Sequence, residues 1–278
     1  MKNKIWLITG ISSGLGKAFA QSVIEKGDFV IGTFRTQSQV EDFNKQHKDN
    51  GFAIELDISN ETEIDKTVES IISKFGRIDV LVNNAGMGFA GAIEETSTQE
   101  VRQVFEVNFF GTLKLTQAVL PFMRKEKKGH IIQISSHAGI KASAGFGIYN
   151  ASKFALEGFS EAMAQEVAPL GIKVSIVEPG PFRTKFADKG KGLEAKKEIS
   201  DYSETAGAFR NKLKGIDGKQ EGDPLKASQA IIDLVNSENP TLRLPLGKVA
   251  LMTIGMKLDS IKSDLEANRK TAENAVYE

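Results

Sequence analysis

Residues Ile5–Gly16 read IWLITGISSGLG, a short apolar run that passes into three closely spaced glycines. An apolar run of this length bounded by a glycine turn is typical of a buried strand. The next residues, Leu15–Lys26, place Ala, Phe and Val on one side of a helical pattern and predict a helix. A strand that leads through glycines into a helix is the first half of a β-α-β unit, so this stretch favours an α/β fold.

The same alternation continues along the chain. Further strands are predicted at Phe29–Thr33, Phe52–Leu56, Val80–Val82, His130–Ile134, Val174–Val177 and, as a short edge strand because of Pro245, Leu242–Leu246. Helices are predicted at Val40–His47, from Asn60 to Phe75, at Thr98–Lys125 with an interruption near Pro121, at Ile148–Pro169 and at Asp223–Ser237. The pattern predicts a Rossmann-type, doubly wound parallel sheet of about seven strands with helices on both faces.

The chain is expected to form a single domain of 278 residues. Residues 1–184 would form its core, and 223–278 would form C-terminal helices that end in a charged helical tail. Between them, residues 185–222 are rich in Lys, Gly and Glu and are expected to form a mobile insertion. Phe186, Tyr202 and Phe209 within it either cover an apolar ligand or anchor the insertion to the core.

Composition excludes several classes of protein. The chain has no cysteine, which removes disulfides, thiolate catalysis and cysteine-bound metals. Its three histidines, His47, His130 and His137, are scattered, so no metal site is predicted. Lys+Arg and Asp+Glu both number 36, which gives no electrostatic reason to expect nucleic acid as a partner. No apolar stretch approaches ~20 residues, so we expect no membrane span. Because cysteine is absent, we expect a cytoplasmic location.

Glycine at Gly10, Gly14 and Gly16 permits backbone angles and close approaches that other residues resist. The helix that follows offers free N–H groups and the positive end of its dipole to a phosphate. The spacing GxxxGxG differs from the GxGxxG dinucleotide fingerprint. Such a turn alone is weak evidence, but its place directly after the first strand predicts a phosphate-binding site.

Five further motifs follow this turn: Asn83-Asn84-Ala85-Gly86, Asn108, Ser136, Tyr149-x-x-x-Lys153 and Pro179-Gly180-x-x-x-Thr184. With Thr9-Gly10-x-x-x-Gly14-x-Gly16 they make residues 1–184 resemble the short-chain dehydrogenase/reductase family, in its order and at its spacing. The pattern at Thr33–Arg35 and the long C-terminal region are closest to hydroxysteroid- and retinol-type members. The resemblance implies an oxidoreductase that interconverts an alcohol and a ketone or aldehyde, with residues 185–222 as a substrate lid.

The resemblance implies four catalytic residues, Asn108, Ser136, Tyr149 and Lys153. Tyr149 and Lys153 lie four residues apart on one helix face, where the ammonium is expected to lower the tyrosine pKa from about 10. Tyr149 would then act as general acid/base, and Ser136, thirteen residues before it, would bind the substrate oxygen. Ser135 is the competing candidate for that role. Asn108 holds a water that relays protons to Lys153, breaks the helix for structural reasons, or does both, since a local helix distortion would admit the water.

The resemblance also implies a dinucleotide cofactor. Its expected contacts are Thr9, Gly10, Ser12, Ser13, Gly14, Leu15, Gly16, Arg35, Asp57, Ile58, Asn84, Ala85, Gly86, Tyr149, Lys153, Pro179, Gly180 and Thr184. Where NAD enzymes carry an acidic residue for the ribose 2′-hydroxyl, this chain has Phe34 followed by Arg35. A guanidinium suits a 2′-phosphate, which favours NADP(H) over NAD(H). Alternatively, Arg35 is solvated or stacks on adenine.

Met87, Phe89, His137 and Phe146 lie close to these motifs and are candidates to line the substrate pocket. The family commonly forms homodimers or homotetramers through the helices that hold Asn108 and Tyr149, so a homo-oligomer is expected. Two other functions fit parts of the pattern. One is a regulator that senses NADP(H) without turnover, against which the four intact catalytic residues argue. The other is a sugar-nucleotide epimerase, which the lack of a sizeable C-terminal domain disfavours.

Overall fold

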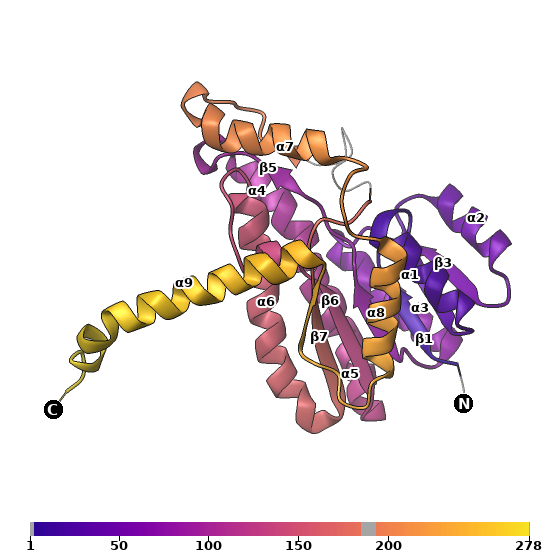
Figure 1. The fold of residues 1–278 in the computed structure, drawn as a ribbon. Helices are drawn as coiled ribbons and strands as arrows, with labels where there is room; N and C mark the ends of the chain where they lie inside the picture. The colour runs from indigo at the N-terminus through magenta and orange to yellow at the C-terminus, as the bar shows by residue number, and fades with distance from the viewer. Residues whose placement is uncertain (1–2, 185–192, 278) are drawn as a thin grey trace.

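The computed structural model describes residues 3–184 and 193–277. Over this range seven strands form a parallel sheet in the order β3-β2-β1-β4-β6-β7-β9 (Figure 1). Their bounds are β1 Ile5–Ile8, β2 Phe29–Phe34, β3 Gly51–Glu55, β4 Val80–Asn83, β6 Gly129–Ile134, β7 Ile172–Pro179 and β9 Arg243–Leu246. The predicted doubly wound α/β fold is confirmed, including the short edge strand that contains Pro245.

Helices cover both faces of the sheet (Figure 1). One face packs against α1 (Gly14–Glu25), α2 (Gln37–Gln46) and α8 (Pro224–Asn236). The other packs against α3 (Glu61–Phe75), α5 (Thr112–Glu126) and α6 (Gly147–Val167). Each strand therefore sends alternate side chains into two apolar layers, which explains the continuous apolar runs from which the strands were predicted.

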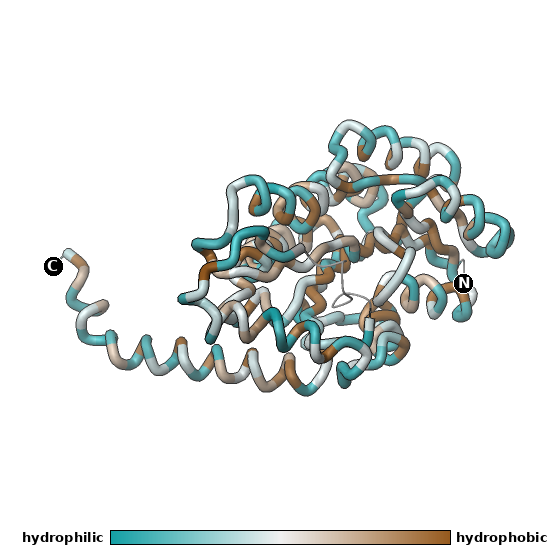
Figure 2. Tube along the Cα trace, turned by 90° about the horizontal axis from the view of Figure 1, so that it is seen from above, coloured by the Kyte–Doolittle hydropathy of each residue, from teal (hydrophilic) through white to brown (hydrophobic). Residues whose placement is uncertain are grey.

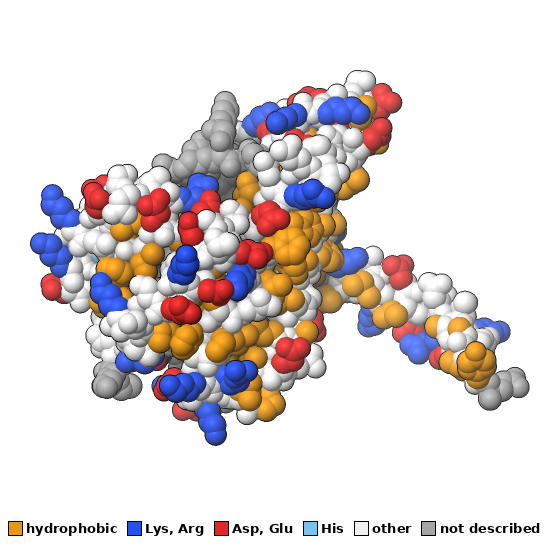
Figure 3. All heavy atoms as spheres, turned by 180° about the vertical axis from the view of Figure 1, so that it is seen from behind, with side chains coloured by type: hydrophobic (Ala, Val, Ile, Leu, Met, Phe, Trp, Pro, Cys, Tyr) orange, Lys and Arg blue, Asp and Glu red, His pale blue; other side chains and the backbone are white. Residues whose placement is uncertain are grey.

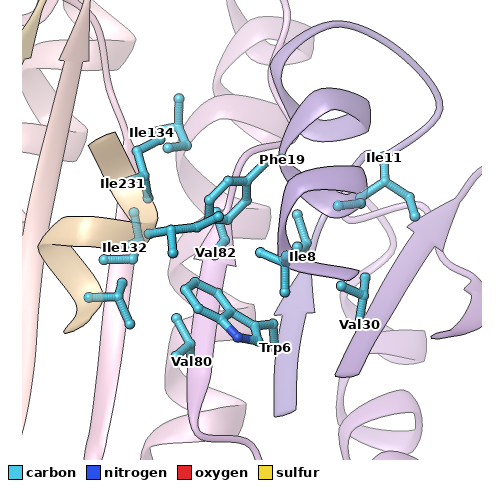
Figure 4. Packing of buried hydrophobic residues seen from close by; sticks show 14 of the residues in the cluster. Trp6, Ile8, Ile11, Phe19, Val30, Val80, Val82, Ile132, Ile134 and Ile231 are labelled. Atoms are coloured by element: carbon cyan, nitrogen blue, oxygen red, sulfur yellow. The ribbon is translucent and has the colours of Figure 1, made fainter. Parts of the chain in front are cut away.

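Trp6 and Phe19 anchor the layer between the sheet and α1. Their rings meet edge to face with centroids 5.4 Å apart, and Trp6 is fully buried (Figure 4). The indole N–H of Trp6 donates to Asp28 Oδ2 at 2.9 Å, so the one polar atom of the ring is satisfied. This contact fixes α1, and with it the glycine turn, against the sheet.

Strand β1 lies between β2 and β4, so the chain winds outward in opposite directions on its two sides. Ligands of doubly wound sheets bind outside the carboxyl ends of the strands at such a switch point. Here those ends are the residues that follow Ile8 and Asn83. The glycine turn and the Asn84–Gly86 segment are thus brought to the same edge of the sheet.

Several boundaries differ from the sequence predictions. The helix predicted over Thr98–Lys125 is divided into α4 (Thr98–Phe105), a π-helical turn η2 (Glu106–Gly111) and α5. The interruption is not near Pro121, which lies inside α5. A Cβ on Gly111 would lie 2.1 Å from the carbonyl oxygen of Ile58, so the widened turn packs directly on the loop after β3.

The part of the expected insertion that is described, residues 193–222, contains elements that the sequence did not predict. These are β8 (Leu193–Glu194), η6 (Ser200–Tyr202), η7 (Ser203–Gly207) and α7 (Ala208–Ile216). Strand β8 pairs in parallel with another unpredicted strand, β5 (Phe89–Ala90). Phe186, proposed as a lid residue, lies outside the described residues.

The predicted helical tail is α9 (Lys248–Glu273), and it projects away from the rest of the molecule (Figures 1 and 2). Short 3-10 turns complete the fold at η1 (Ile93–Glu95), η3 (His137–Gly139) and η4 (Ala168–Leu170). The last of these explains why α6 ends before the predicted Pro169.

We predict that His130 makes stability fall in mild acid. His130 is buried in β6 with Nε2 3.0 Å from Ser175 Oγ, and burial, followed by the charge of Lys173, lowers its pKa to about 4. His130 has a pKa near 6.5 in the unfolded chain and about 4 in the folded chain. Between these two pH values the unfolded chain binds a proton that the folded chain does not bind, so the free energy of unfolding decreases as pH falls. Over this pH range the free energy of unfolding of His130→Gln, measured by urea denaturation, should decrease by up to about 3 kcal/mol less than that of the wild type.

His47→Gln, a change at the half-buried end of α2, is the matched control and should follow the wild type. Equal acid sensitivity of all three proteins would contradict a buried neutral His130.

Candidate active site

Thr9 joins the two loops at the switch point. Its Oγ1 accepts hydrogen bonds from the backbone N–H groups of Asn84 and Ala85, both at 2.9 Å. The Asn84 amide nitrogen in turn donates to the carbonyl oxygens of Thr9 (2.8 Å) and Gly10 (3.2 Å). Both side chains were predicted to contact a cofactor. In the structure their polar atoms hold the two loops together.

Glycine is favoured at each of the three positions of the turn, for a different structural reason at Gly16 than at Gly10 and Gly14. Gly10 and Gly14 have φ of +68° and +61°, which strongly favour glycine. A Cβ on Gly16 would lie 2.4 Å from the Asn84 amide nitrogen and 2.5 Å from the Gly10 carbonyl oxygen, so only glycine fits. Ser13 precedes the first turn of α1 in extended conformation, and Ser12 is exposed beside it, while Leu15 is half-buried.

The turn leads to a cavity of about 430 Å³ that is open to solvent. Its lining includes Gly14 and Thr184, which were predicted as cofactor contacts, and three charged residues that were not, the cationic Lys17 and Arg183 and the acidic Asp217. A cavity at the start of α1 with two cations beside it suits a phosphate group. Thr184 approaches Gly14 closely, because a Cβ there would lie 3.4 Å from Thr184 Cβ.

Arg35, Asp57 and Ile58 lie at the ends of the neighbouring strands β2 and β3. Arg35 is exposed directly after β2. Asp57 is also exposed, and its Oδ1 accepts hydrogen bonds from the backbone N–H (2.9 Å) and hydroxyl (2.7 Å) of Ser59. Ile58 is buried, and its carbonyl oxygen packs against Gly111 of η2.

Tyr149 and Lys153 occupy the first two turns of α6, and both are buried. The Lys153 ammonium lies 5.9 Å from the Tyr149 ring centroid and donates to the carbonyl oxygen of Ile134 at 2.9 Å. A hydrogen bond also joins the side chains of Tyr149 and Ser136. The structure therefore brings together three of the four residues predicted to be catalytic, at the carboxyl end of β6.

The two candidate serines have different surroundings. Ser136 Oγ accepts from the backbone N–H of Ala138 at 3.1 Å, lies 3.4 Å from the carbonyl oxygen of Pro179, and bonds Tyr149. Ser135 Oγ is buried near Glu157, because a Cβ on Gly139 would lie 2.7 Å from the serine oxygen and 3.0 Å from Glu157 Cγ. Ser136 is thus the serine that faces the tyrosine.

Asn108 lies within η2 and is held at both ends of its amide. Its Oδ1 accepts from the backbone N–H of Met87 at 2.8 Å, and its Nδ2 donates to the Met87 carbonyl oxygen (2.9 Å) and to Ser152 Oγ (3.0 Å). A Cβ on Gly86 would lie 3.3 Å from Asn108 Oδ1 and 3.6 Å from Lys153 Nζ. The asparagine therefore has a structural role beside the lysine, one of the two alternatives that the sequence left open.

Burial sets the protonation of the pair. It raises the pKa of Tyr149 to about 12, against a smaller lowering by Ser136, and it lowers the pKa of Lys153 to about 8, against a smaller rise from Glu157. The tyrosine shift is opposite to the lowering expected from a neighbouring ammonium, because removal from water disfavours the phenolate more strongly. At neutral pH Tyr149 is a neutral phenol, the form that donates a proton.

Pro179 and Gly180 close the site at the end of β7. The Gly180 N–H donates to the Leu246 carbonyl oxygen at 2.8 Å, which ties this segment to the edge strand β9. Asn150, which the sequence analysis missed, donates to the Ala138 carbonyl oxygen at 2.7 Å and so holds the loop after Ser136. The sequence signal that could have identified Asn150 is its position next to Tyr149.

The described part of the expected insertion, residues 193–222, reaches Tyr149 through aromatic rings. Phe146 stacks on Tyr149 with centroids 4.2 Å apart, and Phe209 of α7 lies 4.9 Å from Phe146. Tyr202 instead donates to Glu94 Oε2 at 2.7 Å in an exposed position. Of the predicted pocket residues, Phe89 is fully buried with Val104 and Met87 contacts Asn108 through its backbone. His137 lies 3.0 Å from Thr253 of α9.

Two buried carboxylates that sequence reasoning missed hold residues 193–222 against the core. Glu95 forms an ion pair with Arg210 of α7 and accepts the backbone N–H of Ile199 at 2.9 Å. Glu100 accepts the backbone N–H of Lys196 at 3.0 Å. The capping box Ser97-x-x-Glu100 could be recognised in the sequence, but the distant partners of Glu95 and Glu100 could not.

Neither a metal site nor a membrane span is found in the described ranges 3–184 and 193–277. No group of three or more His, Cys, Asp or Glu side chains there could hold a metal ion. No helix there is both long and apolar enough to cross a membrane.

The chain belongs to the short-chain dehydrogenase family, whose model matches residues 4–192. It is 42% identical over 249 residues to 3-ketodihydrosphingosine reductase of Bacteroides thetaiotaomicron, with 89% of each chain covered. It is 34% identical over 255 residues to human retinol dehydrogenase 8, covering 85% of this chain and 79% of that protein. The chain is therefore an oxidoreductase of this family.

A solved short-chain dehydrogenase from Streptomyces avermitilis has the same fold, with a TM-score of 0.92, 42% identity and 99% of both chains covered. Solved structures that share the fold include complexes with NAD and with NADP.

We predict that Arg243 neutralises two buried carboxylates behind the site. Its Nη1 lies 2.5 Å from Glu157 and 2.7 Å from Glu178, both of which are nearly inaccessible to water. Arg243→Ala should lower the free energy of unfolding by about 3–5 kcal/mol at neutral pH, because it leaves these charges unpaired. The loss, measured by urea denaturation, should shrink as pH falls and the carboxyls become neutral.

Arg269→Ala is the matched control, since Arg269 pairs with Glu266 on the exposed tail, where water screens the pair, and this change should leave the free energy of unfolding nearly unchanged. Equal losses for the two variants would show that Arg243 has no special role.

Proposed function

We propose that the chain is an NADP(H)-dependent oxidoreductase that interconverts a ketone or aldehyde and an alcohol, with Tyr149 as the general acid/base. The observation that carries this proposal is the group formed by Ser136, Tyr149 and Lys153. A neutral tyrosine bonded to a serine and backed by a buried lysine is suited to giving a proton to a carbonyl oxygen.

The bound nicotinamide would supply or accept the hydride. In reduction, the Ser136 hydroxyl donates a hydrogen bond to the substrate oxygen and Tyr149 gives it a proton. The positive charge of Lys153 stabilises the phenolate that remains. The Lys153 ammonium would also donate hydrogen bonds to the hydroxyl groups of the nicotinamide ribose. Asn108 keeps the backbone of Met87 and the η2 turn in place beside this lysine.

The residues present fit a dinucleotide phosphate cofactor. The glycine turn at the start of α1 and the cavity lined by Gly14, Lys17, Arg183 and Thr184 suit its phosphate groups. Arg35 is exposed at the end of β2, where an acidic side chain would favour NAD. These features support NADP(H).

We propose 3-ketodihydrosphingosine as the first substrate to test. Its reduction is the activity for which the relative from Bacteroides thetaiotaomicron is named. The rings of Phe146 and Phe209, stacked beside Tyr149, give the site an apolar wall suited to the apolar part of such a molecule.

We expect Tyr149→Phe to reduce kcat by at least ~100-fold, because it removes the proton donor and leaves the ring in place. Turnover is followed by NADPH absorbance at 340 nm, and NADPH affinity by fluorescence titration, which should stay within about threefold. Tyr277→Phe, a change at a fully exposed tyrosine, is the control and should keep full turnover.

Substantial turnover by Tyr149→Phe would exclude Tyr149 as the donor. A wild type that binds NADPH but turns over no carbonyl in a broad panel would favour the sensing function instead.

We expect Arg35→Ser to lower kcat/KM for NADPH by about 10–100-fold and to leave that for NADH nearly unchanged, because only NADPH carries the 2′-phosphate. Arg124→Ser, at an exposed position on α5, is the control. A wild type that prefers NADH, or equal losses with both cofactors, would contradict the role of Arg35.

A further inference from the structure

The first turns of α9 are fixed to the body of the molecule. Ala250 is fully buried, Thr253 Oγ1 lies 3.0 Å from His137 Nδ1, and the Val249 N–H donates to Glu221 Oε1 at 3.2 Å. Residues 258–273, in contrast, are all exposed. The helix therefore leaves the surface in a fixed direction, and at about 1.5 Å per residue it is about 39 Å long (Figure 1).

An apolar stripe runs along this projecting helix. Leu251, Leu258 and Leu265 recur every seven residues, and Ile254 and Ile261 lie between them at the alternating spacing of three and four. The leucines are 62%, 59% and 65% exposed and Ile261 is 42% exposed. Figure 3 shows hydrophobic side chains along the projecting helix. This is the seam of a coiled coil, and such a seam is stable only against a partner.

We propose that the partner is α9 of a second copy of this chain, packed antiparallel so that Leu258 of each copy lies opposite Ile261 of the other. In this register Leu265 meets Ile254 and Leu251 meets Asn268. Every central layer then pairs a leucine with an isoleucine. Two copies related by a twofold axis use the same surface, which gives a closed assembly.

Charged side chains beside the stripe favour this register over a shift by one heptad. Lys257 and Asp264 flank the seam, and in the proposed arrangement Lys257 of each copy faces Asp264 of the other, which gives two ion pairs, while Arg269 approaches Lys248 near the helix start. A shift by one heptad would oppose Asp264 with Asp264 and Lys262 with Lys262. A parallel arrangement would oppose Lys257 with Lys262 and Asp264 with Arg269, and it would bring the two bodies to the same end of the paired helices, whereas the antiparallel pair keeps them at opposite ends.

The charge of α9 argues against an anionic lipid surface as the partner. Residues 248–273 carry five basic side chains (Lys248, Lys257, Lys262, Arg269, Lys270) and four acidic ones (Asp259, Asp264, Glu266, Glu273). Arg269 is moreover paired with Glu266 at 2.7 Å. A helix that binds such a surface usually has an excess of basic side chains. The proposed contact is also separate from the helices that hold Asn108 and Tyr149, and it does not rest on the proposed function.

Light scattering on the full chain tests the contact. Leu258→Asp should halve the molar mass, whether the intact protein is a dimer or a tetramer, because a charge in the seam separates the two α9 helices. Ser263→Asp adds the same charge on the opposite side of α9 and should leave the mass unchanged. Circular dichroism and the Tm check that both variants remain folded. An unchanged mass for Leu258→Asp, or a monomeric wild type, would overturn the proposal.

Charge reversal tests the register. Lys257→Asp and Asp264→Lys should each weaken association at least about tenfold, and the double variant should restore it, because its ion pairs are re-formed with opposite signs. If Lys257→Asp strengthens association, the helices are parallel and the proposed arrangement is wrong.

Because the chain has no cysteine, Lys270→Cys accepts a single spin label. In the antiparallel register the two labels lie about 30 Å apart, whereas in a parallel pair they lie within about 20 Å. Co-sedimentation with anionic phospholipid vesicles is measured in parallel. A monomer that binds vesicles would assign α9 to a lipid surface and overturn the pairing.

Discussion

The hydroxyl of Thr9 accepts backbone N–H groups from Asn84 and Ala85, and the rest of the site depends on this junction. Two loops that leave adjacent strands in different directions expose backbone donors that need partners once water is excluded. One threonine satisfies two of them, and the Asn84 amide returns a hydrogen bond to the Thr9 carbonyl oxygen. The glycine turn that follows Thr9 is therefore held at a fixed place above the sheet. Gly16 maintains the junction from the helix side, because any side chain there would displace Asn84.

Burial is the second constraint, and it changes the pKa values of the candidate catalytic residues. Tyr149 is packed under Phe146, and Lys153 is packed against the end of β6. Burial raises the pKa of Tyr149 and lowers that of Lys153, so it favours the neutral form of each. Glu157, one helical turn after Lys153, belongs to the group of buried charges that Arg243 neutralises. The edge strand β9 thus supplies, through one arginine, the cation that lets α6 carry carboxylates close to the candidate catalytic lysine. Neither the tyrosine shift nor the arginine could be inferred from the Tyr-x-x-x-Lys spacing alone.

Secondary-structure elements that depend mainly on neighbouring residues were predicted well from the sequence. The strand at Ile5–Ile8 was found from a continuous apolar run, because a strand buried on both faces has no polar side to interrupt it. The interruption predicted near Pro121 is absent, and the helix is instead distorted at Asn108, where the sequence analysis had named a break as one of two interpretations. The sequence could not decide between the two sites, since the contact of Gly111 with Ile58 is not visible in it. The elements within residues 193–222 were missed because this segment has little periodicity of its own. It is held by distant partners, notably Glu95, which forms an ion pair with Arg210.

The sequence by itself determined the order of strands and helices, the glycine turn and the relative positions of Ser136, Tyr149 and Lys153 along the chain. These follow from side-chain periodicity and from fixed spacings, which are properties of neighbouring residues. Only the tertiary structure decided which serine faces the tyrosine, which backbone groups Asn84 and Asn108 hold, and in which direction α9 leaves the body. Each of these depends on contacts between residues far apart in the chain, and burial at those contacts sets both the geometry and the charge of the groups involved.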